Sequence, residues 1–407
     1  MAQAAILGLD IGSETVKAVV AESGSGGRMV LRASFNKPSE GLRRGVVVDM
    51  EATAGVVRSL LSEVRQIDKS ALKNIYLRVG GADVKVQSSR GITAVSRANA
   101  EIFKDDIDRV VQSAQALNLP SNRMILHTLN QEFIVDGIGD IEDPLGMTGA
   151  RLELISLIVD AFEPPVKNLT KTVTQSGGSI GGLVFGPLAA ATAVLTKNQK
   201  ELGTILIDIG FGTTGIAVYE ENKLLHTKVL PVGAGHITND LAYALKVPVE
   251  VAEKIKLSYG YALSREVSGK EKVELKKFDE KSKGEPSRKY IAEVIEIRLS
   301  EICDLIGDEL RTIGREKLPG GAVITGGGVK LPGIVELIKQ ELKVSTQIGL
   351  PRASDFEADS PTALSLLEAP EYALVLGLVL SSVATKRPRR ESLSRNPIIN
   401  FLKNLIP

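Results

Sequence analysis

Residues 5–22 read AILGLDIGSETVKAVVAE and residues 204–221 read TILIDIGFGTTGIAVYEE, and the two stretches share one pattern. In each, an apolar run leads into Asp-Ile-Gly, a threonine follows five positions after the aspartate, and a second apolar run comes next. Short apolar runs on both sides of a glycine turn are typical of paired strands. Two matching hairpins in one chain therefore predict a duplicated, two-lobed α/β fold.

The segment between the hairpins has a different character. Residues 83–162 contain several strand-like runs around one amphipathic helix, expected at 98–116, so they predict a small inserted α+β module. A further helix is expected at 166–175, before the chain returns to the main body. Residues 265–289 hold 15 charged side chains in 25 positions and predict a solvated loop or an exposed hairpin. Residues 372–384, the longest apolar run, predict a buried helix.

The charge of the chain is unevenly distributed. Its 407 residues include 50 Lys and Arg against 49 Asp and Glu, for a net charge of +1, which excludes a generally basic nucleic-acid binder. Residues 386–407 alone carry six basic residues and one acidic residue, so they have a net charge of +5 and the rest of the chain has −4. The basic excess is therefore confined to the C-terminal segment.

Several classes of protein and site are disfavoured. A single cysteine, Cys303, allows no intrachain disulfide and predicts a reducing, cytoplasmic compartment. The N-terminus resembles a first buried strand more than a signal peptide, and no run reaches the ~18 apolar residues of a membrane span. With three distant histidines, a metal triad or a Ser-His-Asp catalyst is not expected. His236 has two interpretations, a hydrogen bond within a loop or a place near a phosphate.

The paired glycine turns favour a phosphate ligand. No GxxxxGK[ST] sequence is present, which excludes a P-loop. Residues 210–215 match GxGxxG, but the following residues alternate like strands, so a dinucleotide fold is disfavoured. Tight glycine turns present backbone N–H groups to anions, and two facing hairpins suit a polyphosphate. Asp10 and Asp208 would repel phosphate unless a divalent cation, Mg²⁺ with its waters, lies between them, and Lys17 adds a positive charge.

Two further features fit a nucleoside. The run TGGGVKLPG at residues 325–333 follows an apolar strand and lets backbone approach a base or sugar, although a strand-to-helix turn also needs glycine. Glu253 and Lys256 are three positions apart on one helical face, able to meet ribose hydroxyls or to form a surface ion pair.

The C-terminus predicts a membrane-binding helix. Asn396 and Pro397 suit the N-cap and first position of a helix, behind a basic, proline-containing linker. At ~100° per residue the apolar residues share one face, namely Ile398, Ile399, Phe401, Leu402, Leu405 and Ile406. So short a helix needs a surface to fold against, either the protein itself or an anionic leaflet. The linker favours the leaflet, with ~1 kcal/mol from each basic residue, namely Arg387, Arg389, Arg390 and Arg395.

Taken together, DIGSETVK, DIGFGTT, AEKIK and TGGGVKLPG resemble the phosphate, connecting and adenosine motifs of the actin, sugar-kinase and heat-shock ATPase superfamily. Within it, the insert, HTLNQEFIVDGIGDIEDPLGMTGARLEL, VLPVGAGHITNDLA and the terminal helix resemble the FtsA family of bacterial cell-division actin homologues. This resemblance covers essentially the whole chain. It implies a two-lobed actin-like ATPase fold with duplicated RNase H-like cores, an inserted α+β subdomain, and a C-terminal amphipathic helix on a flexible linker.

The resemblance also implies a site for ATP or ADP with Mg²⁺. The residues implied at the nucleotide are Gly12, Ser13, Glu14, Thr15, Lys17, Gly210, Gly212, Thr213, Thr214, Gly235, Glu253, Lys256, Gly326, Gly327 and Gly328. Asp10 and Asp208 would face the metal through water. The catalytic residues are not assigned.

The implied division of the chain has six parts. These are lobe 1 at 1–82, 163–200 and 354–385, an inserted SHS2-like interaction subdomain at 83–162, the lobe 2 core at 201–243 and 319–353, an outer lobe 2 subdomain at 244–318, a basic linker at 386–395, and the membrane helix at 396–407. The implied role is a filament on the cytoplasmic face of the membrane at the division site. The outer subdomain would bind the FtsZ C-terminal peptide, and the insert would contact neighbouring protomers and late divisome proteins, with no role for nucleic acid.

One departure bears on hydrolysis. Many ATPases of the superfamily carry a glutamate before proline that orients the attacking water, but here Gly186 precedes Pro187. Positioning of water and general-base help contribute about 10²–10⁴-fold in typical hydrolases, so we expect at most slow hydrolysis and a mainly structural nucleotide. The alternatives are a PilM-like pilus-assembly protein and an actin-fold kinase or chaperone-type ATPase.

Overall fold

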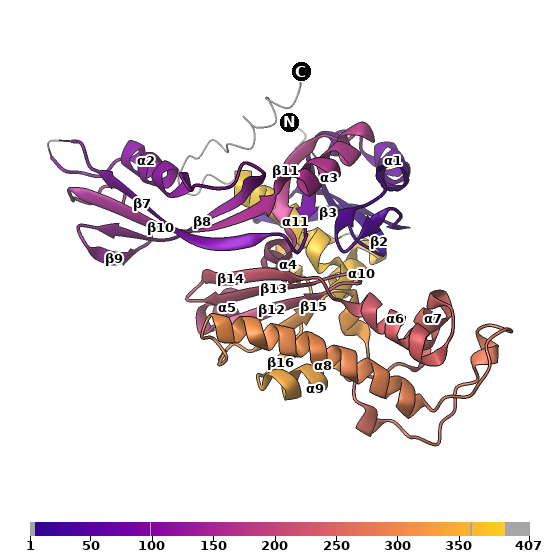
Figure 1. Ribbon diagram of the computed structural model, residues 1–407. Coiled ribbons are helices and arrows are strands. Elements are labelled where there is room, and N and C mark those ends of the chain that lie inside the picture. The colour runs from indigo at the N-terminus through magenta and orange to yellow at the C-terminus, as the bar shows by residue number, and fades with distance from the viewer. Residues whose placement is uncertain (1–4, 98, 359, 387–407) are drawn as a thin grey trace.

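The computed structural model describes residues 5–97, 99–358 and 360–386. Lobe 1 is built on a six-stranded sheet (Figure 1). Its order is β11 (Ile180–Phe185), β6 (Ile75–Val79), β1 (Ile6–Ile11), β2 (Thr15–Ser23), β3 (Met29–Pro38) and β17 (Phe356–Ala358). β1 is antiparallel to β2 and parallel to β6. Every residue of β1 is buried, as expected of an apolar strand covered on both faces.

Lobe 2 repeats this topology in a five-stranded sheet. Its order is β14 (Lys223–Leu230), β13 (Thr214–Glu220), β12 (Thr204–Ile209), β15 (Ala322–Thr325) and β16 (Thr346–Ile348). β12 is antiparallel to β13 and parallel to β15, so it occupies the place that β1 has in lobe 1. Asp10 pairs with Lys17 across the first hairpin, and Asp208 pairs with Gly215 at the same level of the second. The sequence repeat is therefore a structural repeat.

Helices cover both sheets. In lobe 1 these are α1 (Met50–Ile67), α3 (Glu163–Gln175), α4 (Gly186–Val194), α10 (Pro361–Leu367) and α11 (Ala373–Lys386), with a small ribbon of β4 (Leu42–Arg43) and β5 (Val46–Val47). In lobe 2 they are α5 (Lys197–Leu202), which contacts β13, and α6 (Ala234–Leu245), α7 (Val249–Tyr259), α8 (Arg288–Thr312) and α9 (Ile334–Leu342). Figure 1 shows α8 running along the five-stranded sheet with α9 beside it. The Asp49 side chain caps α1 by accepting a hydrogen bond of 3.0 Å from the Ala52 N–H.

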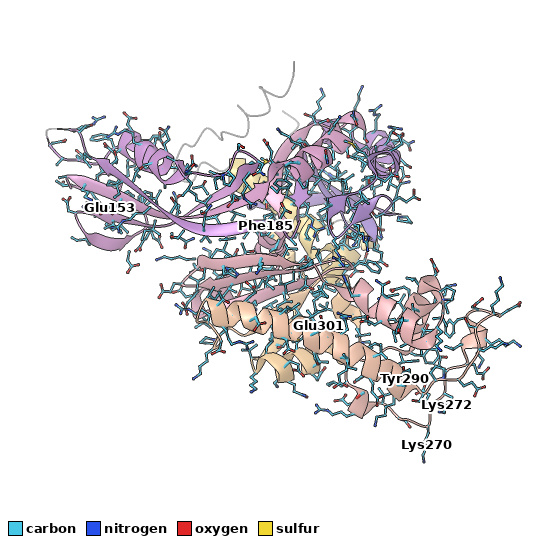
Figure 2. The ribbon with its side chains drawn as sticks, viewed as in Figure 1. Glu153, Phe185, Lys270, Lys272, Tyr290 and Glu301 are labelled. Atoms are coloured by element: carbon cyan, nitrogen blue, oxygen red, sulfur yellow. The ribbon has the colours of Figure 1, made fainter. Side chains whose placement is uncertain are left out.

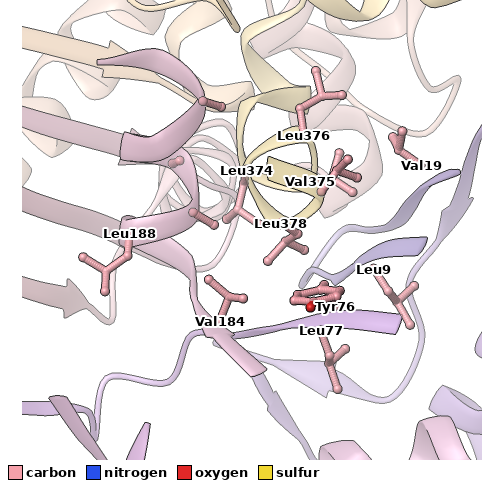
Figure 3. Close-up of a cluster of buried hydrophobic side chains, with 14 of the residues drawn as sticks. Leu9, Val19, Tyr76, Leu77, Val184, Leu188, Leu374, Val375, Leu376 and Leu378 are labelled. Atoms are coloured by element: carbon pink, nitrogen blue, oxygen red, sulfur yellow. The ribbon is translucent and has the colours of Figure 1, made fainter. Parts of the chain in front are cut away.

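The tightest packing of lobe 1 joins α11 to α4 and to β1. Figure 3 shows Leu378 of α11 directed toward Tyr76 of β6, with Val184 of β11 nearby. A Cβ atom at Gly377 would overlap the carbonyl oxygen of Ala189 in α4, so the helices approach at a distance that only glycine permits. α4 also contacts β12 and β13 of lobe 2. Its first residue, Gly186, thus lies where both lobes meet.

The inserted domain has its own sheet and core. Its strands lie in the order β7 (Lys85–Ala94), β10 (Arg151–Phe162), β8 (Arg123–Val135) and β9 (Ile138–Ile141), covered by α2 (Lys104–Gln115). The helix expected at 98–116 begins later, because Asp106 accepts a hydrogen bond of 2.9 Å from the Phe103 N–H and fixes the helix start there.

A buried histidine joins the inserted domain to lobe 1. His127 Nε2 on β8 accepts a hydrogen bond of 3.0 Å from the N–H of Phe185 at the end of β11. Burial lowers the pKa of His127 to about 4, which keeps the ring neutral and able to accept. Figure 2 shows Phe185 where the insert, lobe 1 and the sheet of lobe 2 come together. The insert is therefore attached next to the start of α4.

The highly charged segment at 265–289 is mostly irregular, as expected for a solvated loop. Lys270 and Lys272 lie at the far end of lobe 2, near Tyr290 (Figure 2). Val273 and Leu275 are buried and anchor the segment to the lobe.

In the described part of the chain, no single helix is long and apolar enough to cross a membrane. One pair, Pro361–Leu367 with Pro370–Val383, reaches the required length and composition together but is bent by 89°.

The predicted fold class is confirmed in the described residues, with two related α/β lobes and an inserted α+β domain. The amphipathic helix at 396–407 and its linker lie outside the described residues.

Candidate functional site

The two hairpin turns have the same geometry and meet between the lobes. The Gly12 N–H donates to the Thr15 carbonyl oxygen at 3.0 Å, and the Gly210 N–H donates to the Thr213 carbonyl oxygen at 2.9 Å. A Cβ atom at Gly212 would lie 2.6 Å from the Oγ atom of Ser13, so the tips of the two turns are in contact. The sequence repeat therefore brings two backbone turns to opposite walls of one cleft.

Most of the residues predicted at the nucleotide or its metal line this cleft. From lobe 1 they are Asp10, Gly12, Ser13, Glu14, Thr15 and Lys17, and from lobe 2 they are Asp208, Gly210, Gly212, Thr213, Gly326 and Gly327. Five lining residues were not predicted, namely Arg78, Phe211, Pro370, Glu371 and Leu374. Arg78 is the fourth of the five residues of β6 (IYLRV), and it reaches the cleft because β6 pairs in parallel with β1, which no local sequence signal shows.

The remaining predicted residues lie beside the cleft. Thr214 is buried, and its hydroxyl donates to the Val232 carbonyl oxygen at 2.8 Å, which holds β13 to the chain leading into α6. Gly235 lies against the Phe211 ring, and Gly328 lies against Ile209.

The acidic and basic groups form two clusters, one that lines the cleft and one in lobe 2 outside the cleft lining. At the first, Asp10 Oδ1 lies 3.3 Å from Arg78 Nη1. Loss of hydration raises the pKa of Asp208 to about 6, and Arg78 opposes this increase while Asp10 adds to it. Lys17 lines the same cleft, and its positive charge also lowers the pKa of Asp208.

The carboxylates of the first cluster suit a divalent cation. In the described residues, no group of three or more His, Cys, Asp or Glu side chains is placed to hold a metal by itself. The carboxylates of Asp10 and Asp208, the second with a raised pKa, nevertheless fit Mg²⁺. This ion keeps several waters and binds only one or two protein carboxylates together with phosphate oxygens. The donor set therefore fits Mg²⁺ only together with a phosphate ligand.

The second cluster is a hydrogen-bonded network in lobe 2. Lys256 Nζ lies 2.7 Å from Glu253 Oε2 and 2.8 Å from Thr238 Oγ1, and Thr238 also donates to Glu253. The Lys256 side chain is only 8% exposed, so this pair is not the surface ion pair considered from the sequence. Burial raises the pKa of Glu14, with a further increase from the negative charge of Glu253.

Two histidines have structural partners. His236 Nδ1 accepts a hydrogen bond of 3.1 Å from the Gly233 N–H at the start of α6, and burial is the main cause of its lowered pKa. His226 on β14 is outside the cleft lining, and its Nε2 lies 3.1 Å from Glu309 Oε2. His236 lies in the first turn of α6, where its ring accepts the bond from Gly233, so the structure favours the hydrogen-bonding interpretation, in a helix and not in a loop.

Gly186 occupies the first position of α4 beside the carboxylate cluster. A Cβ atom there would lie 3.0 Å from Arg78 Nε and 3.4 Å from Leu374 Cδ1, and both of those residues line the cleft. A side chain at this position would therefore point at the site, and glycine leaves no carboxylate there.

The predicted membrane face lies outside the described residues. It comprises Ile398, Ile399, Phe401, Leu402, Leu405 and Ile406, with Arg389, Arg390 and Arg395 before and beside it.

Comparison with known proteins gives matches over nearly the whole chain. The family described as "Cell division protein FtsA" matches residues 205–377, and "SHS2 domain inserted in FTSA" matches residues 81–159. The cell division protein FtsA of Pseudomonas aeruginosa is 34% identical over 376 residues, covering 92% of this chain and 88% of that protein. That of Bacillus subtilis is 34% identical over 371 residues, covering 91% and 82%.

Solved structures share the fold at lower identity. The PilM–PilN type IV pilus biogenesis complex gives a TM-score of 0.66 at 20% identity, covering 93% of this chain and 98% of the matched chain. MreB5 of Spiroplasma citri bound to AMPPNP gives 0.56 at 16% identity, covering 96% and 99%. These likenesses concern the fold alone.

Proposed function

This chain belongs to the FtsA family of actin-like cell division proteins, and from that premise we propose that it binds ATP or ADP with Mg²⁺ in the cleft between its lobes. The observation that carries this proposal is the contact between the two hairpin turns, which places backbone N–H groups on opposite sides of one polyphosphate site. The phosphates would lie between these turns, and the glycines 326–328 would lie against adenosine. Glu253 and Lys256 would face the ribose.

When bound, Mg²⁺ would supply the positive charge that lets phosphates lie beside two carboxylates. Asp10 and Asp208 would hold it, at least partly through water. Lys17 on β2 lines the same cleft and adds a positive charge. The resulting balance of charge favours a polyanion together with its metal over either alone.

We further propose that the nucleotide acts mainly as an assembly ligand, with at most slow hydrolysis. Gly186 begins α4 next to the carboxylate cluster and has no side chain to orient a water molecule. Rapid phosphate release by the purified full chain at saturating Mg-ATP would contradict this proposal.

In the cell, we propose a filament on the cytoplasmic face of the membrane at the division site. The helix at 396–407 would enter the interface by ~5–10 Å, and polymerisation would combine many weak anchors into stable attachment. The subdomain at 244–318 would hold the FtsZ C-terminal peptide, and the insert would recruit late divisome proteins. The PilM and kinase alternatives lose support because the family match is to FtsA.

Titration calorimetry of the full chain tests the nucleotide site. We expect ATP and ADP to bind with Mg²⁺ and the variant Lys17→Ala to bind both about tenfold more weakly, since it removes a charged donor. Lys37→Ala is the matched control, because Lys37 lies on β3 and pairs with Glu63 at 2.5 Å outside the cleft lining. A wild-type chain that binds neither nucleotide would refute the proposal.

Vesicle co-sedimentation tests the membrane anchor. Deleting residues 396–407 is expected to abolish binding to vesicles that contain anionic lipid while ATP binding is unchanged. Retained vesicle binding by the shortened chain would contradict the assignment.

A further inference from the structure

Arg78 is a buried cation at the cleft with unused hydrogen-bonding capacity. Its side chain is 12% exposed, and its Nη1 atom donates to Asp10 Oδ1 at 3.3 Å. Its Nε atom is buried and has no hydrogen-bond partner among the described residues. An arginine presents five N–H donors in a planar fork, and leaving a buried donor unpaired costs about 1–3 kcal/mol. This arrangement suits a ligand that supplies acceptors.

The structure makes room for this guanidinium. A Cβ atom at Gly80 would lie 2.7 Å from both Nε and Nη2 of Arg78, and one at Gly186 would lie 3.0 Å from Nε. Arg78 therefore fills the space that a side chain at Gly186 would enter. The guanidinium of Arg78 therefore occupies the space toward which a carboxylate side chain at residue 186 would point.

Strand order places Arg78 at one end of the cleft. β6 lies on the side of β1 opposite β2, and Arg78 lies beside Val184 of β11 at the carboxyl ends of these parallel strands. Ligands of open α/β sheets bind at this edge.

The pKa values of Asp208 and Glu14, two carboxyl groups in the cleft, respond to different charged neighbours. After burial, the pKa of Asp208 responds most strongly to Arg78, and then to Asp10 and Lys17. After burial, the pKa of Glu14 responds to Glu253 and Lys256, then Lys17, and Arg78 is not among its neighbours. Arg78 lines the cleft in contact with Asp10. Glu253 and Lys256 belong to a network in lobe 2 that lies outside the cleft lining.

We propose that Arg78 binds the terminal phosphate of a nucleoside triphosphate and gives the cleft its preference for ATP over ADP. This inference rests on the proposed function, in which Glu253 and Lys256 face the ribose and the phosphates extend toward Asp10. The last phosphate then reaches the Arg78 end, where the unpaired Nε and the Nη groups donate to its oxygens. Arginine suits this contact because its fork matches phosphate oxygens in two parallel hydrogen bonds, which lysine cannot reproduce.

The same contact explains how the protein distinguishes nucleotides without fast hydrolysis. With ADP bound, Arg78 keeps its ion pair with Asp10 and has no third phosphate to contact. With ATP bound, the guanidinium bridges lobe 1 and the ligand that lobe 2 also grips. The triphosphate thereby holds the lobes together through one more contact than the diphosphate does.

Binding selectivity of the full chain tests this proposal. Dissociation constants are measured by calorimetry for AMPPNP and ADP, each with Mg²⁺, in the wild type, Arg78→Gln and Arg78→Lys. Arg315→Gln is the matched control, because Arg315 pairs with Glu220 at 2.9 Å outside the cleft lining. We expect Arg78→Gln to weaken AMPPNP binding by about 10- to 100-fold, in line with loss of charge-assisted hydrogen bonds. ADP binding should change by less than about threefold.

Arg78→Lys is the control for a folding defect, because it keeps a positive charge beside Asp10. It is expected to weaken AMPPNP binding several-fold with ADP binding unchanged, and to melt at the wild-type temperature. Equal weakening of both nucleotides, or no change in either, would overturn the role of Arg78. A wild-type chain that binds neither nucleotide would refute the proposed function instead.

Discussion

Replacing Arg78 and Gly186 together is expected to accelerate ATP hydrolysis, which we propose to be slow in the wild type. In the structure a Cβ atom at Gly186 points at Arg78 Nε, 3.0 Å away. A glutamate introduced there alone would pair with the guanidinium and would not orient water. In the double variant Arg78→Ala/Gly186→Glu, the space now filled by the guanidinium becomes available to a carboxylate and a water molecule.

The size of the effect follows from what a positioned base contributes. General-base help and water positioning supply about 10²–10⁴-fold in typical hydrolases, which corresponds to roughly 3–5 kcal/mol of activation free energy. We therefore expect kcat for phosphate release to rise by at least about 100-fold in the double variant. The assay is steady-state phosphate release at saturating Mg-ATP, because loss of Arg78 is expected to weaken ATP binding and so to affect KM.

Three controls isolate the carboxylate. Arg78→Ala alone, Gly186→Glu alone and Arg78→Ala/Gly186→Gln should all hydrolyse ATP at or near the wild-type rate. If the double variant binds ATP, melts as the wild type does and still shows no acceleration, then Gly186 is not the reason for slow hydrolysis. Fast hydrolysis by the wild type would refute the premise.

The remaining predictions concern stability. Burial raises the pKa of Asp208 to about 6, so ionisation of this group should lower the stability of the nucleotide-free protein as the pH rises from about 4 to 6. Denaturant unfolding should therefore find Asp208→Asn more stable than the wild type above pH 6 and equally stable near pH 4. Removing Glu253 leaves the buried ammonium of Lys256 without its carboxylate, and urea unfolding of Glu253→Ala should show a loss of about 3 kcal/mol. Gly377→Ala forces α11 away from α4 and should cost at least about 2 kcal/mol by the same measurement. Gly307→Ala, within α8 and facing only a flexible arginine tip, is its control and should stabilise by about 0.5–1 kcal/mol.

The duplicated fold could be predicted because its signal is local and repeated. The DIG turns around Asp10 and Asp208 are each flanked by apolar runs, and both runs of each pair became strands in the same register. The buried helix expected at 372–384 was also predicted correctly and is α11 (Ala373–Lys386). A long apolar run is stable in a folded protein only when it is buried in the core.

Features that depend on contacts between residues distant in the chain could not be predicted from the sequence. Arg78 lines the cleft only because β6 pairs in parallel with β1, and its position depends on glycines at 80 and 186. Thr214 shares a motif with Thr213, yet its hydroxyl is used in holding β13 to Val232. Such roles are set by tertiary packing, whereas a motif records only which residue types are near in sequence.

The most direct test of the central claim is the position of this protein in dividing cells of its source bacterium. A fluorescent fusion that leaves the C-terminus free is imaged before and after depletion of FtsZ, beside a fusion lacking residues 396–407. The account predicts a mid-cell band that disappears when FtsZ is depleted and in the shortened chain. A diffuse or polar signal in cells with an intact FtsZ ring would contradict it.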